Sequence, residues 1–423
     1  MNCTIKFFRS ILISLIFMLT GMGLLGAESS LTVWDFKYTD HRTEIAINRI
    51  DNLFRKSNPD ITLIHKGFFD QEYIPALRAA LLAGTGPDIL WLHMGPELAE
   101  NQPYLESLDD FLDNSGLLFR SASLDYCRDD TGALKALPLT FQGIGWYYNK
   151  ELFRSVGLDP ENPPDDWYDF LIACKTLKNQ GITPIAMGNN RPMTTEFLRR
   201  SLITAFFTEE EIESFYDQGQ GPGTERFRMI LAFGRELRDK GYFDESGVYR
   251  PYFNYASDSF SQGKSAMILG LLSDIAHWKN FTDSLGRENV GYFPNLIHPG
   301  MKRPGAQLLQ DAGVLVAINK ASENKEAASL YLNHLFSGES QEILTEDLGM
   351  LIPLEESVLP VDDYPLLEQI YHALQNTGTD PEMSVPSNYI KDLQYRLDDL
   401  LINSREITIN EYLKKFRDEL KLY

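Results

Sequence analysis

The residues with the greatest chemical potential are aromatic rings interspersed with amides and carboxylates. Sugars present apolar C–H faces that pack on rings, and hydroxyls that pair with planar hydrogen-bonding groups. The candidate rings are Trp34, Phe69, Trp91, Phe141 and Trp146, and the candidate polar groups are Asp70, Gln142, Asn189, Arg191, Gln310 and Asp311. Core packing is the alternative for every ring, and the stripes that hold Trp34, Trp146 and Trp167 favour it. The combination is typical of a site for neutral polyols.

Motifs for bond-breaking chemistry are largely missing from the sequence. The stretch 263–265 (GKS) resembles the end of a phosphate loop, but Asp258 stands where the motif needs a glycine. The sequence has no G-x-S-x-G and no H-E-x-x-H, and its seven histidines lack metal-ligand spacing. Adjacent carboxylates such as Asp165 and Asp166 suit helix starts. Because two carboxylates across a cleft suffice for a glycosidase, an exported carbohydrate-active enzyme remains an alternative.

The net charge of the chain limits the kinds of molecule that it is expected to bind. The chain has 423 residues, with 39 Lys and Arg against 60 Asp and Glu, so its formal net charge is −21. Nucleic acid is not expected as a partner, because phosphate binding needs a basic face. The length predicts two or three domains or lobes, and the 43% hydrophobic content is enough for large cores.

Residues 1–27 are predicted to be a secretory signal peptide. Lys6 and Arg9 precede an uncharged, mostly apolar run at residues 11–25, and the small pair Gly26-Ala27 ends it. We therefore expect export to the periplasm or another extracytoplasmic compartment, with a retained anchor as the alternative. No cysteine lies near the end of the run, so a lipoprotein anchor is not expected.

Two cysteines remain after this segment. Cys127 and Cys174 could form a disulfide in an oxidising compartment. Cys174 also falls on the apolar stripe of a predicted helix, where a small buried thiol is the alternative.

After the predicted signal peptide, the first part of the chain alternates between patterns typical of strands and of helices. Short apolar runs at residues 31–34, 61–64 and 87–92 predict buried strands. Residues 45–54 and 73–82 have helical spacing. This alternation predicts an α/β fold with a mainly parallel sheet.

The alternation changes character near residues 138–145, but no polar linker follows. This indicates two lobes that share several chain crossings. The tail at residues 387–422 is predicted to be one amphipathic helix. Ligands of open α/β sheets bind beyond the carboxyl ends of strands. The loops that we expect at a site are therefore 35–40, 68–72, 91–97, 188–195 and 270–274.

Several short stretches in a fixed order carry a family resemblance. They are 84–91 (GTGPDILW), 146–153 (WYYNKELF), 163–170 (PPDDWYDF), 181–186 (GITPIA), 260–267 (FSQGKSAM) and 317–328 (AINKASENKEAA). Together they resemble the family 1 extracellular solute-binding proteins of bacterial ABC importers, the maltose-binding-protein-like group. The resemblance covers most of residues 31–350.

The resemblance implies a two-lobed periplasmic-binding-protein (type II) clamshell with three hinge crossings. Lobe one would comprise residues 31–140 and 313–348, and lobe two residues 141–309 and 353–423. The crossings would lie near residues 140–142, 310–313 and 349–353. A ligand would bind in the cleft between the lobes.

The resemblance also assigns site residues. Gln142 stands where a relative carries a ligand-binding acidic residue, and Tyr38, Asp70 and Arg191 fall near other ligand contacts. Trp91 and His93 follow the Pro-Asp strand, and one or both are expected to face the cleft.

Two departures from the family pattern touch this predicted pocket. Leu271-Leu272 stands where many relatives carry a ring-stacking tryptophan, and Trp278 is the next ring. Gln310-Asp311 replaces part of a common Gly-Gly-Ser stretch. Leu272, Gln310 and Asp311 therefore complete the expected ligand-binding set.

The implied function is that of a solute-binding subunit. It would bind a mono- or oligosaccharide as a monomer and deliver it to the permease and ATPase of an ABC importer. No catalysis, cofactor or metal is expected. A sensory sugar-binding protein that feeds a receptor is a further alternative, because both roles use the same clamshell.

Overall fold

The computed structural model describes residues 29–39, 41–272, 277–310, 313–355, 363–373, 376–381 and 385–422. The predicted signal peptide and Asp311 lie outside the described residues. The chain divides into two compact units: the first comprises residues up to 90 together with 318–335, and the second comprises 91–317 and 336–423. The expected lobe boundaries stay a prediction. None of the helices in the described part of the chain has the length and apolar character that a membrane crossing requires.

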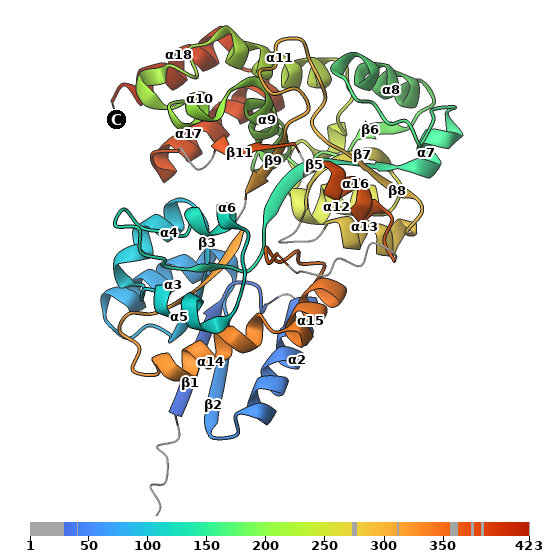
Figure 1. Ribbon diagram of the computed structural model, residues 1–423. Coiled ribbons are helices and arrows are strands. Elements are labelled where there is room, and N and C mark those ends of the chain that lie inside the picture. Colours follow the sequence, from blue (N-terminus) through green and yellow to red (C-terminus); the bar gives the residue numbers. More distant parts are fainter. Residues whose placement is uncertain are drawn as a thin grey trace, which may run out of the picture. The chain divides into compact units, whose positions relative to one another are not determined.

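The first unit is built on three parallel strands (Figure 1). β1 lies between β2 and β3, and its apolar residues Leu31 and Val33 are fully buried. The helix α2 buries one stripe that includes Ile47, Ile50 and Phe54, and it ends before Asn58-Pro59, where proline opposes further helix. The elements are β1 (Ser29–Asp35), α2 (His41–Ser57), β2 (Ile61–Gly67), α3 (Asp70–Leu82), β3 (Ile89–His93) and α14 (Lys325–Leu335).

The boundary between the units runs through strands β3 and β10 (Val314–Ile318) themselves. The strand order of this sheet is β2-β1-β3-β10-β4, and β4 (Leu137–Pro138) pairs with β10 in antiparallel fashion.

The second unit holds a mixed sheet in the order β11-β9-β5-β7-β6, with β8 also paired to β5. All eight residues of β5 are buried, as expected for a central strand covered on both faces. Gly145 is required there, because a Cβ would lie 1.8 Å from the Tyr292 hydroxyl oxygen. The strands are β5 (Gln142–Asn149), β6 (Thr183–Ile185), β7 (Ser265–Leu271), β8 (Val290–Phe293), β9 (Gln307–Gln310) and β11 (Thr377–Thr379).

The expected mainly parallel arrangement holds for β1 to β3. The directions of the strands in the second unit were not part of that expectation. β5 is antiparallel to β7, β8 and β9. Strand and helix spacing along the chain does not encode which strands pair, so the direction of these long-range partners is invisible in the local pattern.

The second unit also contains most of the helices. The longer ones are α8 (Trp167–Asn179), α9 (Met193–Phe206), α11 (Glu225–Asp239), α13 (His277–Leu285), α15 (Gly338–Leu348), α16 (Leu366–Ala373), α17 (Asn388–Asp398) and α18 (Ile409–Leu420). The shorter ones are α4 (Pro96–Asn101), α5 (Asp109–Ser115), α6 (Ser121–Asp125), α7 (Lys150–Ser155), α10 (Glu209–Glu213) and α12 (Ser257–Ser261). The 3₁₀ and π turns are η1 (Gln102–Tyr104), η2 (Asp217–Gly219), η3 (Glu245–Gly247), η4 (Tyr252–Ala256) and η6 (Asp399–Asn403).

The prediction that the tail forms one helix is wrong. It forms two helices, α17 and α18, with η6 between them. Arg405 adopts a left-handed φ of 59°, which ends the first helical run. Thr408 then starts α18 with a capping box, in which its side chain accepts from the Glu411 backbone N–H and the Glu411 carboxylate accepts from the Thr408 N–H. Figure 1 shows α17 and α18 beside α9 and α11, with which they are in contact.

Candidate functional site

Three predicted site residues meet at one end of the second sheet. Gln142 opens β5 and lies opposite Gln310, the last residue of β9. The Gln142 Oε1 atom accepts hydrogen bonds from the backbone N–H of Gly143 at 3.0 Å and of Leu272 at 3.1 Å. Leu272 follows the end of β7 and is fully buried. The structure therefore brings Gln142, Leu272 and Gln310 together, with the Gln142 carbonyl used as a brace.

The three predicted crossing segments are hydrogen bonded to one another next to this point. The Phe141 N–H donates to the Leu351 carbonyl at 3.0 Å, and the Gly313 N–H donates to the Thr140 carbonyl at 2.6 Å. A Cβ on Gly313 would lie 2.8 Å from the Thr140 Oγ1 atom, so the close approach needs glycine. Phe141 is buried, with the guanidinium carbon of Arg120 5.8 Å from its ring centroid. These bonds place residues from all three segments side by side.

Trp91 and His93 differ in their access to solvent. Trp91 is fully buried. The His93 side chain is 39% exposed, and its Nδ1 atom lies 3.0 Å from the Glu97 carboxylate. Of the two side chains, that of His93 is the one accessible to solvent.

Asn189 is held inside the second unit. Its amide nitrogen donates to Asn403 Oδ1 at 2.7 Å, its Oδ1 accepts the Thr195 N–H at 3.2 Å, and Asn403 donates back to its carbonyl at 2.8 Å. The neighbouring Arg191 is exposed. Asn189 remains a predicted ligand contact that its burial does not favour. Asn403 is the residue that the sequence did not reveal, because its partner lies 214 residues away.

In the first unit, Tyr38 lies in the loop that follows β1. Its hydroxyl donates to Asn48 Oδ1 at 2.6 Å, and its ring is stacked on His65, with centroids 4.8 Å apart and an interplanar angle of 11°. Gly67 permits this approach, because a Cβ there would lie 2.7 Å from the Tyr38 Cβ. Asp70 is the first residue of α3, directly after the exposed Phe69.

His65 is buried between two carboxylates. Its Nε2 lies 2.5 Å from Asp35 Oδ2 and its Nδ1 lies 3.0 Å from Asp51 Oδ2. Burial alone lowers the pKa of His65, but the hydrogen bonds to Asp35 and Asp51 outweigh it and raise this pKa to about 9. His65 is therefore an imidazolium at neutral pH. No motif marked it, because its two partners are separate in the sequence.

Most of the candidate rings belong to the core. Trp146 and Trp167 are buried, and both pack on Phe170. Trp278 is fully buried, and its indole N–H donates to the Gly349 carbonyl at 2.9 Å. Trp34 is partly exposed at the end of β1, with the Lys66 ammonium 5.0 Å from its ring centroid.

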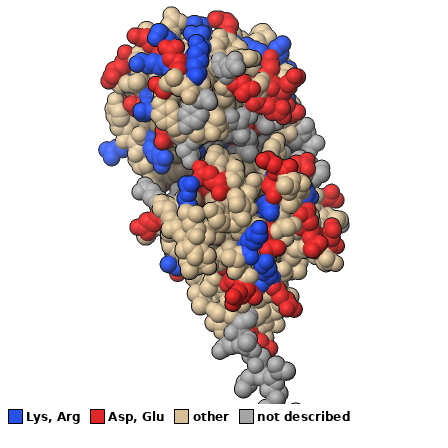
Figure 2. Space-filling model, turned by 90° about the vertical axis from the view of Figure 1, so that its left-hand side faces the viewer, with Lys and Arg blue, Asp and Glu red and all other residues tan. Residues whose placement is uncertain are grey.

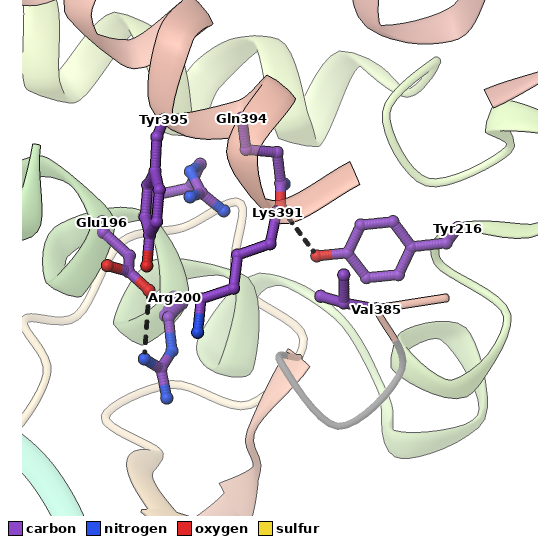
Figure 3. A pocket seen from close by; sticks show the side chains of 8 residues that line it. Glu196, Arg200, Tyr216, Val385, Lys391, Gln394 and Tyr395 are labelled. Atoms are coloured by element: carbon purple, nitrogen blue, oxygen red, sulfur yellow. Dashed lines mark hydrogen bonds and ion pairs between the residues drawn. The ribbon is translucent and has the colours of Figure 1, made fainter. Parts of the chain in front are cut away.

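A small pocket lies between α9 and α17, and none of its lining residues is one of the predicted site residues (Figure 3). Its charged side chains are already paired: Arg199 with Asp398 at 3.1 Å, and Arg200 with Asp380 and with Glu196. The lining residues are Glu196, Arg199, Arg200, Tyr216, Val385, Lys391, Gln394 and Tyr395. This arrangement fits a braced helix interface better than a ligand site.

The remaining candidate groups are an acidic cluster and two cysteines. Among the described residues, the acidic cluster that could hold a metal is Asp165, Asp166 and Asp169, and Asp166 is the N-cap of α8. Cys127 and Cys174 are both free and buried, so the disulfide alternative is not adopted. Figure 2 shows acidic and basic side chains interspersed over the face that it presents.

Comparison with curated proteins finds partial relatives. The sn-glycerol-3-phosphate-binding periplasmic protein UgpB of Shigella flexneri serotype 5b (strain 8401) is 27% identical over 172 residues, which are 38% of this chain and 39% of the relative. UgpB of Escherichia coli (strain K12) is 26% identical over the same shares. The matched region thus spans about two fifths of these relatives' length.

Solved structures resemble nearly the whole chain. A chitin oligosaccharide binding protein has a TM-score of 0.79 at 21% identity, covering 93% of this chain and 98% of that one. The maltose-bound MalE3 of T. maritima has a TM-score of 0.75 at 21% identity, covering 93% and 99%. The expected α/β fold of the type II periplasmic-binding-protein class is confirmed.

The family described as bacterial extracellular solute-binding protein matches residues 41–342, well over half of the sequence. The chain therefore belongs to the bacterial extracellular solute-binding protein family.

Proposed function

We propose that this chain is the extracytoplasmic solute-binding subunit of an ABC importer. It binds a mono- or oligosaccharide and delivers it to a membrane permease and its ATPase. The observation that carries the proposal is the family match over residues 41–342. The chain acts without turnover, as a monomer that is exported by its first 27 residues.

The ligand is held by polar groups of both predicted lobes. Tyr38, Asp70 and His93 belong to predicted lobe one, and Gln142 and Arg191 to predicted lobe two. Closure about the segments at residues 140–142, 310–313 and 349–353 traps the ligand, because the closed state binds it more tightly than the open state. The hydrogen bonds of Phe141 to Leu351 and of Gly313 to Thr140 support a shared hinge.

A polyol phosphate is the second candidate ligand. It is favoured by the names of the curated relatives, which bind sn-glycerol 3-phosphate. Such a ligand needs cationic or N–H donors for its phosphate. Arg191 is exposed in the loop after β6 and supplies one guanidinium.

A thermal-shift screen of residues 28–423 tests the proposal. The panel contains malto-, xylo- and chito-oligosaccharides, monosaccharides, glycerol, sn-glycerol 3-phosphate and inorganic phosphate. A ligand that binds only the folded protein raises its melting temperature with increasing concentration. A shift with one saccharide, recovered chemically unchanged, supports the proposal. A shift with sn-glycerol 3-phosphate alone supports the second candidate. Release of products from the saccharide would instead favour the exported enzyme.

The importer and sensory roles need a different experiment. Deletion of the gene abolishes uptake of the radiolabelled ligand if the chain feeds an importer. Unchanged uptake with loss of a transcriptional response to that ligand would favour a sensory role.

A further inference from the structure

A buried ionic cluster in the first unit ties the sheet to the loop that follows β1. Asp35, the last residue of β1, uses its two oxygens differently. Its Oδ1 accepts the backbone N–H groups of Lys37 and Tyr38, each at 2.6 Å. Its Oδ2 lies 2.5 Å from His65 Nε2. The loop conformation therefore depends on one carboxylate, and the orientation of that carboxylate depends on His65.

The other side of His65 is anchored in the helix layer. Its Nδ1 atom lies 3.0 Å from Asp51 Oδ2 on α2, and Asp51 Oδ1 accepts the Tyr331 hydroxyl of α14 at 2.7 Å. The side chains of Asp35 and Asp51 are fully buried, and that of His65 is 1% exposed. This chain of contacts joins β1, β2, α2 and α14.

The two carboxylates determine how many N–H protons His65 must carry to donate to both of them. A neutral imidazole has a single N–H, so it can donate to Asp35 or to Asp51 but not to both. An imidazolium donates to both. Asp51 has other partners, the Tyr331 hydroxyl and the Arg55 guanidinium at 3.9 Å. Among the described residues, His65 is the side chain that contacts the Oδ2 atom of Asp35. Loss of the proton breaks one of the two contacts of the ring, and either loss weakens the chain of bonds that runs from α2 through His65 to Asp35 and its loop.

We propose that Asp35, His65 and Asp51 form an ionic clamp in which His65 is the positioning residue that holds the loop at residues 36–39 in its ligand-binding conformation. The inference rests on the proposed function, because that loop carries Tyr38, a predicted ligand contact. The ring of Tyr38 is stacked on His65, and its hydroxyl donates to Asn48. A displaced loop would break these contacts and move Tyr38 out of its ligand-binding position.

The clamp makes ligand affinity sensitive to alkaline pH. The groups that face His65 are Asp35 from β1, Asp51 and Arg55 from α2, Tyr38 from the loop and Tyr331 from α14. Burial raises the pKa of both tyrosines above the usual value, so these phenols stay protonated while His65 titrates. The imidazole is therefore the group that loses charge as the pH rises through about 9.

The Asp51→Asn variant separates charge from geometry. The Asn oxygen still accepts the Tyr331 hydroxyl, and its amide donates to Nδ1 of a neutral imidazole, whose Nε2–H then donates to Asp35. This variant keeps the clamp without the imidazolium. The His65→Gln variant loses one of the two contacts at every pH.

The test measures two quantities in wild type, Asp51→Asn and His65→Gln at about pH 7 and about pH 10. The first is the hydrogen-exchange protection of the Lys37 and Tyr38 amides, corrected for intrinsic rate and measured without ligand. The second is the dissociation constant of the ligand found in the screen. Circular dichroism at both pH values and in each variant checks that the protein stays folded.

Over this pH range we expect the amide protection of wild type to fall about tenfold and its dissociation constant to rise about tenfold. Asp51→Asn should show no pH dependence in either quantity, and His65→Gln should have low protection and low affinity at both pH values. Protection and affinity of wild type that do not change, or an Asp51→Asn variant as pH-sensitive as wild type, would overturn the clamp. If no ligand binds at any pH, the proposed function fails, and amide protection alone still decides whether the clamp exists.

Discussion

Asn189 and Asn403, 214 residues apart in the chain, exchange two hydrogen bonds inside the second unit, at 2.7 and 2.8 Å. Both side chains are buried. The tail therefore closes the lobe by bracing the loop that starts at Gly188, and the family match, which ends at residue 342, does not include this brace.

Replacing Asn403 by Ala should destabilise the protein by about 2–3 kcal/mol, because buried groups of Asn189 lose their partners. Urea denaturation measures the change. Asn190→Ala is the matched control, since that neighbouring side chain is exposed, and it should change stability by less than about 0.5 kcal/mol. Equal stabilities of the two variants would contradict the brace.

Gln142→Ala should weaken ligand binding about tenfold while costing about 1 kcal/mol of stability. The Gly143 N–H loses its acceptor, but the Leu272 N–H keeps its bond to the Gly143 carbonyl at 2.9 Å. The Gln142→Glu variant keeps an oxygen that can accept the Gly143 N–H but has no amide N–H groups. It therefore distinguishes the bracing role of the oxygen from a role of the amide nitrogen. Titration calorimetry of both variants gives the answer, and an unaltered dissociation constant in Gln142→Ala would remove this residue from the site.

Trp278→Phe should lower stability by about 1–2 kcal/mol and leave ligand affinity unchanged. The indole N–H that donates to the Gly349 carbonyl is lost, but the ring is buried and packs on Tyr364 rather than reaching a ligand. Thermal unfolding and calorimetry measure the two effects. A fall in affinity without a fall in stability would show that Trp278 is a ligand-stacking ring after all.

Arg199→Met should destabilise the protein by about 3–5 kcal/mol, because it leaves Asp398 buried without its cation. The pair is buried on both sides. The exposed pair of Lys414 and Asp418 is the control, and Lys414→Met should cost less than about 1 kcal/mol. Similar unfolding midpoints for the two variants would contradict this reading of the α9–α17 interface.

Stability should also depend on the charge of His65. Its folded pKa of about 9 lies above the ordinary 6.5. The contribution, roughly 3 kcal/mol, is therefore fully present below about pH 6.5 and is lost as the pH rises through about 9. Urea unfolding across this range measures the loss, with Asp51→Asn as the variant that should show much less of it. A wild-type stability that is level across these pH values would contradict the assignment.

Local patterns predicted the local elements well. The apolar runs at residues 31–34, 61–64 and 87–92 correspond to β1, β2 and β3, and the stripe of Trp167, Phe170, Cys174 and Leu177 is the buried face of α8. In each case the periodicity of a single element decides which side chains are buried.

Long-range partners could not be predicted in the same way. The roles of His65 and Asn403 depend on groups that only the fold brings near, and the antiparallel partners of β5 are separated from it by long stretches of chain. Of the predicted site, the structure brings Gln142, Leu272 and Gln310 together at one end of the second sheet. Gln142 and Leu272 are buried, as are Asn189 and Trp91.

The most direct test of the account is titration calorimetry of residues 28–423 with the saccharides of the screen and with sn-glycerol 3-phosphate. We expect saturable binding of one saccharide at one site, with a dissociation constant of about 1 μM or lower, and recovery of that saccharide unchanged. Absence of binding to every saccharide, or hydrolysis of the one that binds, would contradict it.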